Sequence, residues 1–249
     1  MSQTASSARL TVGDEPDEPG GRHANDAREG SPKALGKDNQ MSSSQWDRLA
    51  PLTGIGFVIL VVAGNALQGT TPALHGDADA VAEFYGAKAT PISLGMTLSL
   101  ISLFFLAWFL GSLHRTLLRA EGRDGHLSMV ALAGGTAAIA LLAAGFSFNA
   151  AGALRARENG SIPPETAAIF YDGSLVFMGL AATLAMAILL APTAVIAFRF
   201  RALPRWVAAF TAVLAVLGLV TPLSFILFLV FPVWILAVSV LLYRRGRLE

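Results

Sequence analysis

ISLGMTLSLISLFFLAWFLGSL, residues 92–113, is the stretch that decides the fold, because it contains no charged side chain. A helix of this length extends about 33 Å at 1.5 Å per residue, enough to cross a hydrocarbon core about 30 Å thick. His114 and Arg115 follow it directly, and Arg119 and Arg123 come soon after. Arginines beside a membrane span are retained on the cytoplasmic side. The stretch therefore predicts a transmembrane helix whose C-terminal end faces the cytoplasm.

The composition of the whole chain also indicates a membrane protein. Its 249 residues are 54% hydrophobic and 14% charged, with a mean hydropathy of +0.58, whereas soluble domains carry about 25% charged residues. The formal net charge of +1 argues against nucleic acid as a partner, because neutralising several phosphates requires a clustered basic face. The absence of cysteine excludes disulfides, Cys-ligated zinc, iron–sulfur centres and thiol catalysis. We expect no cofactor.

Six apolar segments are candidates for spans. They lie at about 50–67, 92–113, 127–154, 174–198, 206–220 and 223–242. Basic clusters at 115–123, 199–205 and 244–247 follow the second, fourth and sixth segments, and a net acidic segment, 68–90, follows the first. Six spans place all three basic clusters on one side, whereas five would place 244–247 outside, against the positive-inside rule. The sequence therefore predicts an all-α fold, a polytopic bundle of six transmembrane helices (residues 46–249) with both termini in the cytoplasm.

The source and the N-terminal segment can also be inferred. Arginine outnumbers lysine, and alanine, glycine and leucine are heavily used, as a GC-rich bacterial genome would produce, so we expect a bacterial cell membrane. Residues 1–45 are rich in Gly, Pro, Ser and mixed charges and bury too little apolar area to fold, which predicts a disordered cytoplasmic tail. The alternative is that Met41 is the true start.

Several local signals predict where helices begin, bend and turn. Asp77 and the residues after it are typical of a capped, amphipathic surface helix, after which Pro91 opens the second span. Pro163-Pro164 followed by Glu165 predicts a helix start. Pro192 predicts a kink. Thr221-Pro222 predicts a tight turn between the last two spans.

Small residues predict close helix packing in two spans. Ala131, Gly135 and Ala138 lie on one face of the third span, which allows neighbouring backbones to approach. We therefore expect this span at the centre of the bundle. Gly95, Ser99 and Ser102 form a second small stripe, which we expect to meet the third span.

Three segments resemble a known group of proteins. They are WFLGSLHRTLLRAEG (108–122), RALPRW (201–206) and VWILAVSVLLYRR (233–245). The chain from about 46 to 247 resembles a family of small six-span membrane proteins of GC-rich bacteria that is defined only as a domain of unknown function. The resemblance implies the same architecture and supplies no activity, cofactor or site residue.

Polar residues near the predicted outer side are the candidate binding site. Asn65 ends the first span, Asn149 lies in the third, and Asp172 precedes the fourth. Asp172, Gly179 and Thr183 have spacings of seven and four and are expected on one helix face. If that face points inward, Asn65, Asn149 and Asp172 converge on a small outer pocket. The alternative is that these groups meet interfacial water or bond a neighbouring helix.

Histidines and acids near the loops invite a metal hypothesis. His75, Asp77, Asp79 and Glu83 have spacings that can ligate a divalent ion. The simpler interpretation is an acidic helix N-terminus in solvent, and we predict no metal site. His114 and His126 are expected to be exposed loop residues.

The function classes follow from the polar residues that are present and missing. No span has an Asp, Glu, Lys or Arg in its interior, which disfavours a proton- or ion-coupled pump. No nucleophile arrangement is found, so no catalytic residue is predicted. We expect a non-enzymatic accessory or interaction component, with the lipid bilayer and a membrane protein partner or a second copy as its contacts. A transporter for a small neutral or weakly polar molecule is the alternative, and a membrane-embedded enzyme acting on lipid is a third.

Overall fold

The computed structural model describes residues 52–72, 77–122, 124–220 and 224–245. The chain divides into two units, 1–39 and 40–249, and every described residue belongs to the second. The predicted tail at 1–45, Met41, His75 and the Thr221-Pro222 turn lie outside the described residues.

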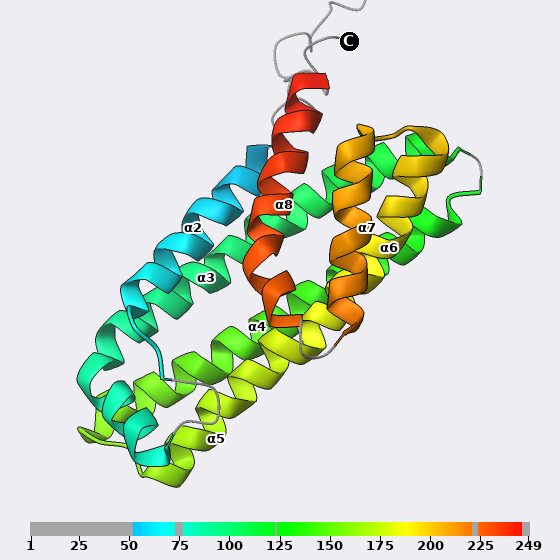
Figure 1. Cartoon of the computed structure of the whole chain (residues 1–249). Coiled ribbons are helices and arrows are strands. Elements are labelled where there is room, and N and C mark those ends of the chain that lie inside the picture. The colour runs from blue at the N-terminus through cyan, green and yellow to red at the C-terminus, as the bar shows by residue number, and fades with distance from the viewer. Residues whose placement is uncertain (1–51, 73–76, 123, 221–223, 246–249) are drawn as a thin grey trace, which may run out of the picture. The chain divides into compact units, whose positions relative to one another are not determined.

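The described part of the chain contains helices and no strands, which confirms the all-α prediction. The helices are α2 (Thr53–Gln68), α3 (Ala78–Glu121), α4 (His126–Asn159), α5 (Pro164–Leu175), the π-helix η2 (Val176–Ala181), α6 (Ala182–Phe200), α7 (Arg205–Leu219) and α8 (Ser224–Arg245). α5, η2 and α6 follow one another without a break, so the described chain makes six helical passes (Figure 1).

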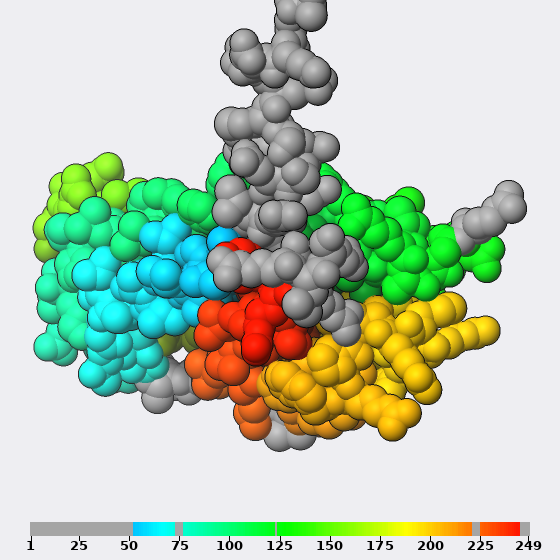
Figure 2. Space-filling view, turned by 90° about the horizontal axis from the view of Figure 1, so that it is seen from above, coloured from blue at the N-terminus to red at the C-terminus, as the bar shows by residue number. Residues whose placement is uncertain are grey.

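The six passes are arranged as a ring in sequence order. Each helix packs against the next one along the chain, α2 on α3, α3 on α4, α4 on α6, α6 on α7 and α7 on α8, and α8 returns to α2. Figure 2 shows α8 between α2 and α7, viewed from the end where α8 finishes. Short connections between antiparallel neighbours produce this order.

The two ends of the ring differ in charge. One end, which we call the arginine end, carries Arg115, Arg119, Arg199, Arg201, Arg205 and Arg244 (Figure 1). The opposite end, which we call the acidic end, carries Asp77, Asp79, Glu83, Glu158, Glu165 and Asp172 together with Lys88, Arg155 and Arg157. The basic clusters of the described chain therefore share one end, as the sequence predicted.

Four of the passes are long and apolar enough to cross a membrane: Ala78–Glu121, His126–Asn159, Pro164–Phe200 and Phe225–Arg244. α2 and α7 have 16 and 15 residues, which at 1.5 Å per residue gives only about 24 and 22 Å. α3, with 44 residues, extends about 66 Å, twice the thickness of a hydrocarbon core.

The connections are shorter than the sequence predicted, because the helices continue through the charged segments. The segment 114–126 was expected to be a loop, but α3 runs to Glu121 and α4 begins at His126. Gly122 and Gly125 have φ values of 86° and 59° and turn the chain between the two helices. The connection between the predicted spans 127–154 and 174–198 is also reduced, because α4 ends at Asn159 and α5 begins at Pro164.

The start of α3 agrees with the predicted surface helix and extends it. The Asp77 side chain accepts a hydrogen bond from the Asp79 backbone N–H at 3.3 Å and caps the helix. Lys88 interrupts the helix with non-helical backbone angles (φ −126°, ψ 23°). The segment before Lys88 and the span after Pro91 are therefore two helical pieces joined at a kink.

The small stripe on α3 meets α2, whereas the sequence analysis assigned it to the third span. A Cβ atom added to Gly64 of α2 would lie 2.5 Å from the carbonyl oxygen of Gly95. The same added Cβ would lie 2.6 Å from the Oγ of Ser99. The two backbones touch at these glycines, as expected for small residues at a helix crossing.

The third span, which the sequence predicts at the centre of the bundle, packs on α3, α5, η2 and α6 but is less buried than two of the other passes. The most apolar window of α4 is 33% buried, against 50% for α3 and for α5–α6. Ala131, Gly135 and Ala138 are buried as predicted, and Gly135 packs on Leu110 of α3. The opposite face of α4, which includes Ala133, Ala137 and Ala140, is exposed.

Candidate functional site

A buried hydrogen bond joins α3 and α4 near the acidic end. The Tyr85 hydroxyl donates to the Oδ1 of Asn149 at 3.0 Å, and the two residues are 0% and 5% exposed. Tyr85 precedes the kink at Lys88 and lies outside the apolar stretch 92–113. Burial raises the pKa of Tyr85, with smaller contributions from Tyr171 and Asp172. The phenol therefore stays protonated and remains a donor to Asn149.

The loop after α2 is held by two side chains from other helices. The Tyr171 hydroxyl on α5 donates to the carbonyl oxygen of Pro72 at 2.7 Å. The Lys88 ammonium donates to the carbonyl oxygens of Gln68 and Thr70 at 3.3 and 3.1 Å. Lys88 thus binds the carbonyls at the C-terminal end of α2, where a cation is favoured by the helix dipole.

Asp172 and Thr183, which the sequence predicts on one helix face, lie in different environments. Asp172 is exposed, whereas Thr183 is fully buried and bonds the carbonyl oxygen of Gly179 at 2.7 Å. The π-helix η2 (Val176–Ala181) lies between Asp172 and Thr183. A π-helix adds a residue to the turn and rotates the following positions away from their α-helical alignment. α6 continues as one helix through Pro192, where the sequence predicts a kink, and the change of helical period lies at η2.

Asn65 is placed differently from Asn149 and Asp172. It lies on the exposed side of α2, and its Nδ2 donates to the carbonyl oxygen of Val61 at 2.8 Å. It lines a pocket of about 230 Å³ that neither Asn149 nor Asp172 lines. The three predicted residues have three different environments, and their role in binding stays a prediction.

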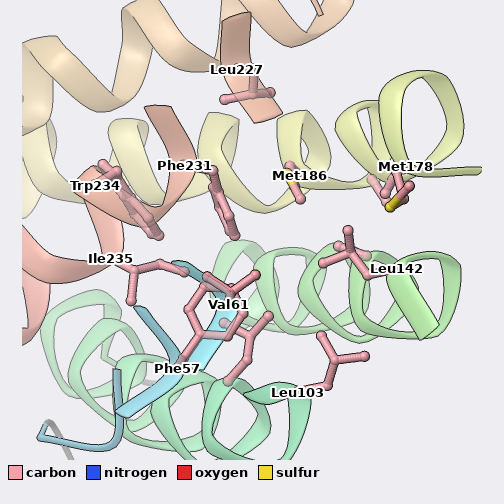
Figure 3. Packing of buried hydrophobic residues seen from close by; sticks show 14 of the residues in the cluster. Phe57, Val61, Leu103, Leu142, Met178, Met186, Leu227, Phe231, Trp234 and Ile235 are labelled. Carbon is pink, nitrogen blue, oxygen red and sulfur yellow. The ribbon is translucent and has the colours of Figure 1, made fainter. Parts of the chain in front are cut away.

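The pocket with Asn65 is formed by four helices. It is lined by Phe57, Val61, Val62 and Asn65 of α2, Leu142 and Phe146 of α4, Met186 of α6, and Phe228, Leu229, Phe231 and Pro232 of α8. Figure 3 shows Val61, Leu142, Met186 and Phe231 pointing toward a common space. Asn65 is the single polar residue of this lining, so the pocket favours hydrocarbon.

A second hollow lies at the arginine end. It has a volume of about 730 Å³ and is lined by Ala197, Phe198, Arg199, Arg201, Leu203, Pro204 and Arg205. Arg201 has a left-handed φ of 53° at the end of α6. The arginines that line this hollow are able to contact anionic lipid headgroups. Anchoring of the helix ends at the membrane surface explains these arginines equally well.

The acidic residues near the start of α3 behave as the simpler interpretation expected. Asp77 is the helix cap, and Asp79 lies in the first turn. The metal hypothesis also used His75, which lies outside the described residues. Within the described ranges no group of three His, Cys, Asp or Glu side chains could hold a metal ion.

His114 is not the exposed loop residue that the sequence predicts. It belongs to α3, is partly buried, and its Nδ1 lies 3.1 Å from the carbonyl oxygen of Ser128 on α4. His126 is exposed, as predicted. His114 links the two helices at the arginine end because α3 continues past the apolar stretch.

No family model, curated protein or solved structure matches the chain. The resemblance to six-span proteins of GC-rich bacteria therefore stays a prediction, and function must be argued from this chain alone.

The sequence did not predict the hydrogen bonds of Tyr85 and Tyr171 or the pocket. A signal was present for the tyrosines, since Phe84-Tyr85-Gly86 and Phe170-Tyr171-Asp172-Gly173 repeat one pattern close to the acidic end of two helices. Phe84 contacts the rings of both Tyr85 and Tyr171. The pocket had no comparable signal, because it depends on the angle between α2 and α8.

Proposed function

We propose that the protein is a six-span integral membrane protein of a bacterial cell membrane with both termini in the cytoplasm. Each of the six passes has one end toward the arginine end (Figure 1), and the positive-inside rule favours an arginine end in the cytoplasm. α2 and α7 are short, but a short span is accommodated by local thinning of the bilayer. Under this placement, the ends of α3, α4 and α5 extend beyond the membrane on the outside.

Within that membrane we propose a non-enzymatic component that acts through helix–helix contact. The observation that carries the proposal is an uncovered face of α4 made of small side chains. Ala133, Ala137, Ala140 and Ser147 are exposed and Ala144 is half-buried, at spacings of four, three, four and three. We call these five residues the α4 small face.

The α4 small face differs from the other lipid-facing surfaces of the bundle. The exposed side of α3 presents large side chains, among them Leu94, Ile101, Phe104 and Trp108. In lipid, helix association is driven by close packing, and small side chains let two backbones approach. A small face left open in the monomer is therefore suited to a second transmembrane helix.

The partner we propose is the same face of a second copy. Two copies in one membrane have the same orientation, so a two-fold axis along the membrane normal brings α4 against α4 in parallel. Spacings of four and three are those at which parallel helices interlock with small positive crossing angles. The face is thus complementary to itself, with Ala140 near its middle.

Disulfide crosslinking tests this proposal, because the chain has no cysteine of its own. Ala140→Cys should form a crosslinked dimer in membranes on mild oxidation, since a disulfide requires Cβ atoms about 4 Å apart. The control is Ile101→Cys on the exposed face of α3, which should stay monomeric. Crosslinking of both variants to the same extent, or of neither, would contradict the proposal.

The alternative, a transporter, has one observation in its favour, the pocket lined by Asn65. Its walls are apolar, which suits a hydrocarbon better than a polar solute.

A further inference from the structure

The pocket lined by Asn65 exists because α2 and α8 separate toward the acidic end. Near the arginine end they touch: a Cβ on Gly54 of α2 would overlap Ser239 and lie 3.0 Å from Ile235 of α8. Figure 1 shows the two helices diverging from there. In the other half, the pocket lies between Val62 and Asn65 on α2 and Phe228 and Leu229 on α8.

The pocket has an apolar interior and a mouth at the surface of the bundle. Its deep walls are buried side chains from α4, α6 and α8: Leu142, Phe146, Met186 and Phe231. At its mouth, Val62 and Leu229 are 56% and 60% exposed. A pocket of about 230 Å³ is larger than an apolar cavity of about 150 Å³ that stays dry and takes up benzene. It is large enough for a segment of one hydrocarbon chain.

We propose that this pocket takes up an acyl chain of a membrane phospholipid, which enters sideways between α2 and α8. The inference uses the membrane placement proposed above. At that depth the solvent at the mouth is lipid, so the nearest molecule able to fill an apolar pocket is a neighbouring acyl chain. A polar solute would lose its hydrogen bonds to water among these apolar side chains, whereas a hydrocarbon chain has no hydrogen bonds to lose.

Asn65 gives the site a polar contact at the level of the lipid ester groups. It lies one turn before the end of α2 at Gln68, where the hydrocarbon core meets the headgroup region. One N–H of its amide is used by the Val61 carbonyl, and an amide has a second N–H and a carbonyl oxygen. The second N–H is the donor we assign to an ester carbonyl of the bound lipid.

Trp234 provides an intrinsic reporter for an occupied pocket. It is 0% exposed, and its ring stacks on Phe231, a pocket wall, with centroids 5.6 Å apart. Replacing Trp46, Trp108 and Trp206 by Phe leaves it as the single tryptophan. Bromine atoms on acyl chains quench indole fluorescence at short range, so a chain in the pocket should quench Trp234.

The experiment compares pocket variants of the single-tryptophan protein in vesicles of phosphatidylglycerol with brominated chains. Val62→Phe narrows the mouth at an exposed position and should reduce the quenching at least twofold, and Val61→Phe should do the same from inside. Ile59→Phe, at a residue of α2 that is 63% exposed and does not line the pocket, is the matched control and should leave the quenching unchanged. Asn65→Leu removes one hydrogen bond and should weaken binding by about two- to tenfold.

Two results would overturn the proposal. The first is equal quenching in the parent, Val62→Phe and Ile59→Phe proteins, since the bromines would then reach Trp234 without the pocket. The second is quenching by brominated free fatty acid in vesicles without brominated phospholipid, with none by the brominated phospholipid itself. Leu142 and Phe146 lie on the side of α4 opposite the α4 small face. Failure of crosslinking at Ala140 would therefore count against the proposed dimer alone, and failure of quenching at Trp234 against the lipid site alone.

Discussion

The Tyr85 hydroxyl on α3 donates to the amide oxygen of Asn149 on α4 across 3.0 Å, in a place where both side chains are buried. This contact joins the two helices beyond the apolar stretch 92–113. It explains why a polar amide is tolerated inside a helix of low polarity, since its oxygen has a donor.

Tyr85→Phe should lower the free energy of unfolding by about 1–3 kcal/mol, because the Asn149 oxygen stays buried and loses its donor. Thermal unfolding in mild detergent measures the change. Asn149→Leu should be similarly harmful, and the double variant should lose less than the sum of the two. Strictly additive losses would show that the two groups act separately.

Gly95→Ala should lower the free energy of unfolding by about 1–3 kcal/mol, as overpacking does. Its Cβ would overlap the backbone of Gly64 on α2, which cannot move as a side chain can. Gly111→Ala in the same helix is the control, because nothing lies within 4 Å of its added Cβ. That change should leave stability equal or raise it by up to about 1 kcal/mol, since Ala is the better helix former. Equal effects of the two substitutions would contradict the close α2–α3 contact.

Glu121→Gln should destabilise the start of α4 by about 1 kcal/mol, the typical cost of a lost helix cap. The Glu121 carboxylate accepts hydrogen bonds from the backbone N–H groups of Leu127 and Ser128 at 2.7 and 2.8 Å. The cap residue Gly125 has no side chain to do so. Thermal unfolding at neutral pH checks the change, with the exposed Glu158→Gln at the other end of α4 as control.

The same carboxylate predicts a dependence of stability on pH. Desolvation acts to raise the pKa of Glu121, but the hydrogen bonds from Leu127 and Ser128 outweigh it, so the pKa is lowered. A carboxyl with a lowered folded-state pKa contributes stability above its unfolded value, about 4.3, and loses it as the pH falls through the folded value. The parent protein should therefore lose more stability than Glu121→Gln on going from neutral pH to below about 4. The same loss in both proteins would contradict this role.

The sequence predicted the helical passes well, because uncharged blocks such as 92–113 and 127–154 have one structural solution in lipid. It failed on helix ends. Arg155 and Glu158 suggested a loop, yet α4 continues to Asn159. Charged residues stop a membrane span but do not stop a helix, which ends where a residue such as Gly160, at φ 72°, leaves the helical region.

The candidate site was less predictable for two physical reasons. Asp172 was assigned to the face of Thr183 on a regular α-helical period, and the π-helix between them changes that period. Asn65 was expected to meet Asn149, but which side of α2 faces α4 depends on the crossing angles of three helices. Neither the change of helical period nor the crossing angles can be derived from the spacing of residues along one helix.

The placement in the membrane is the central claim, and labelling of single cysteines in intact cells with a membrane-impermeant maleimide tests it most directly. Cysteines at Thr70 and Glu158, near the acidic end, and at Val220, directly after the end of α7 at Leu219, should react. Cysteines at Asp124 and Arg201, near the arginine end, should react only after the cells are opened. Labelling of Arg201→Cys in intact cells, or protection of Val220→Cys, would contradict a six-span protein with its arginine end in the cytoplasm.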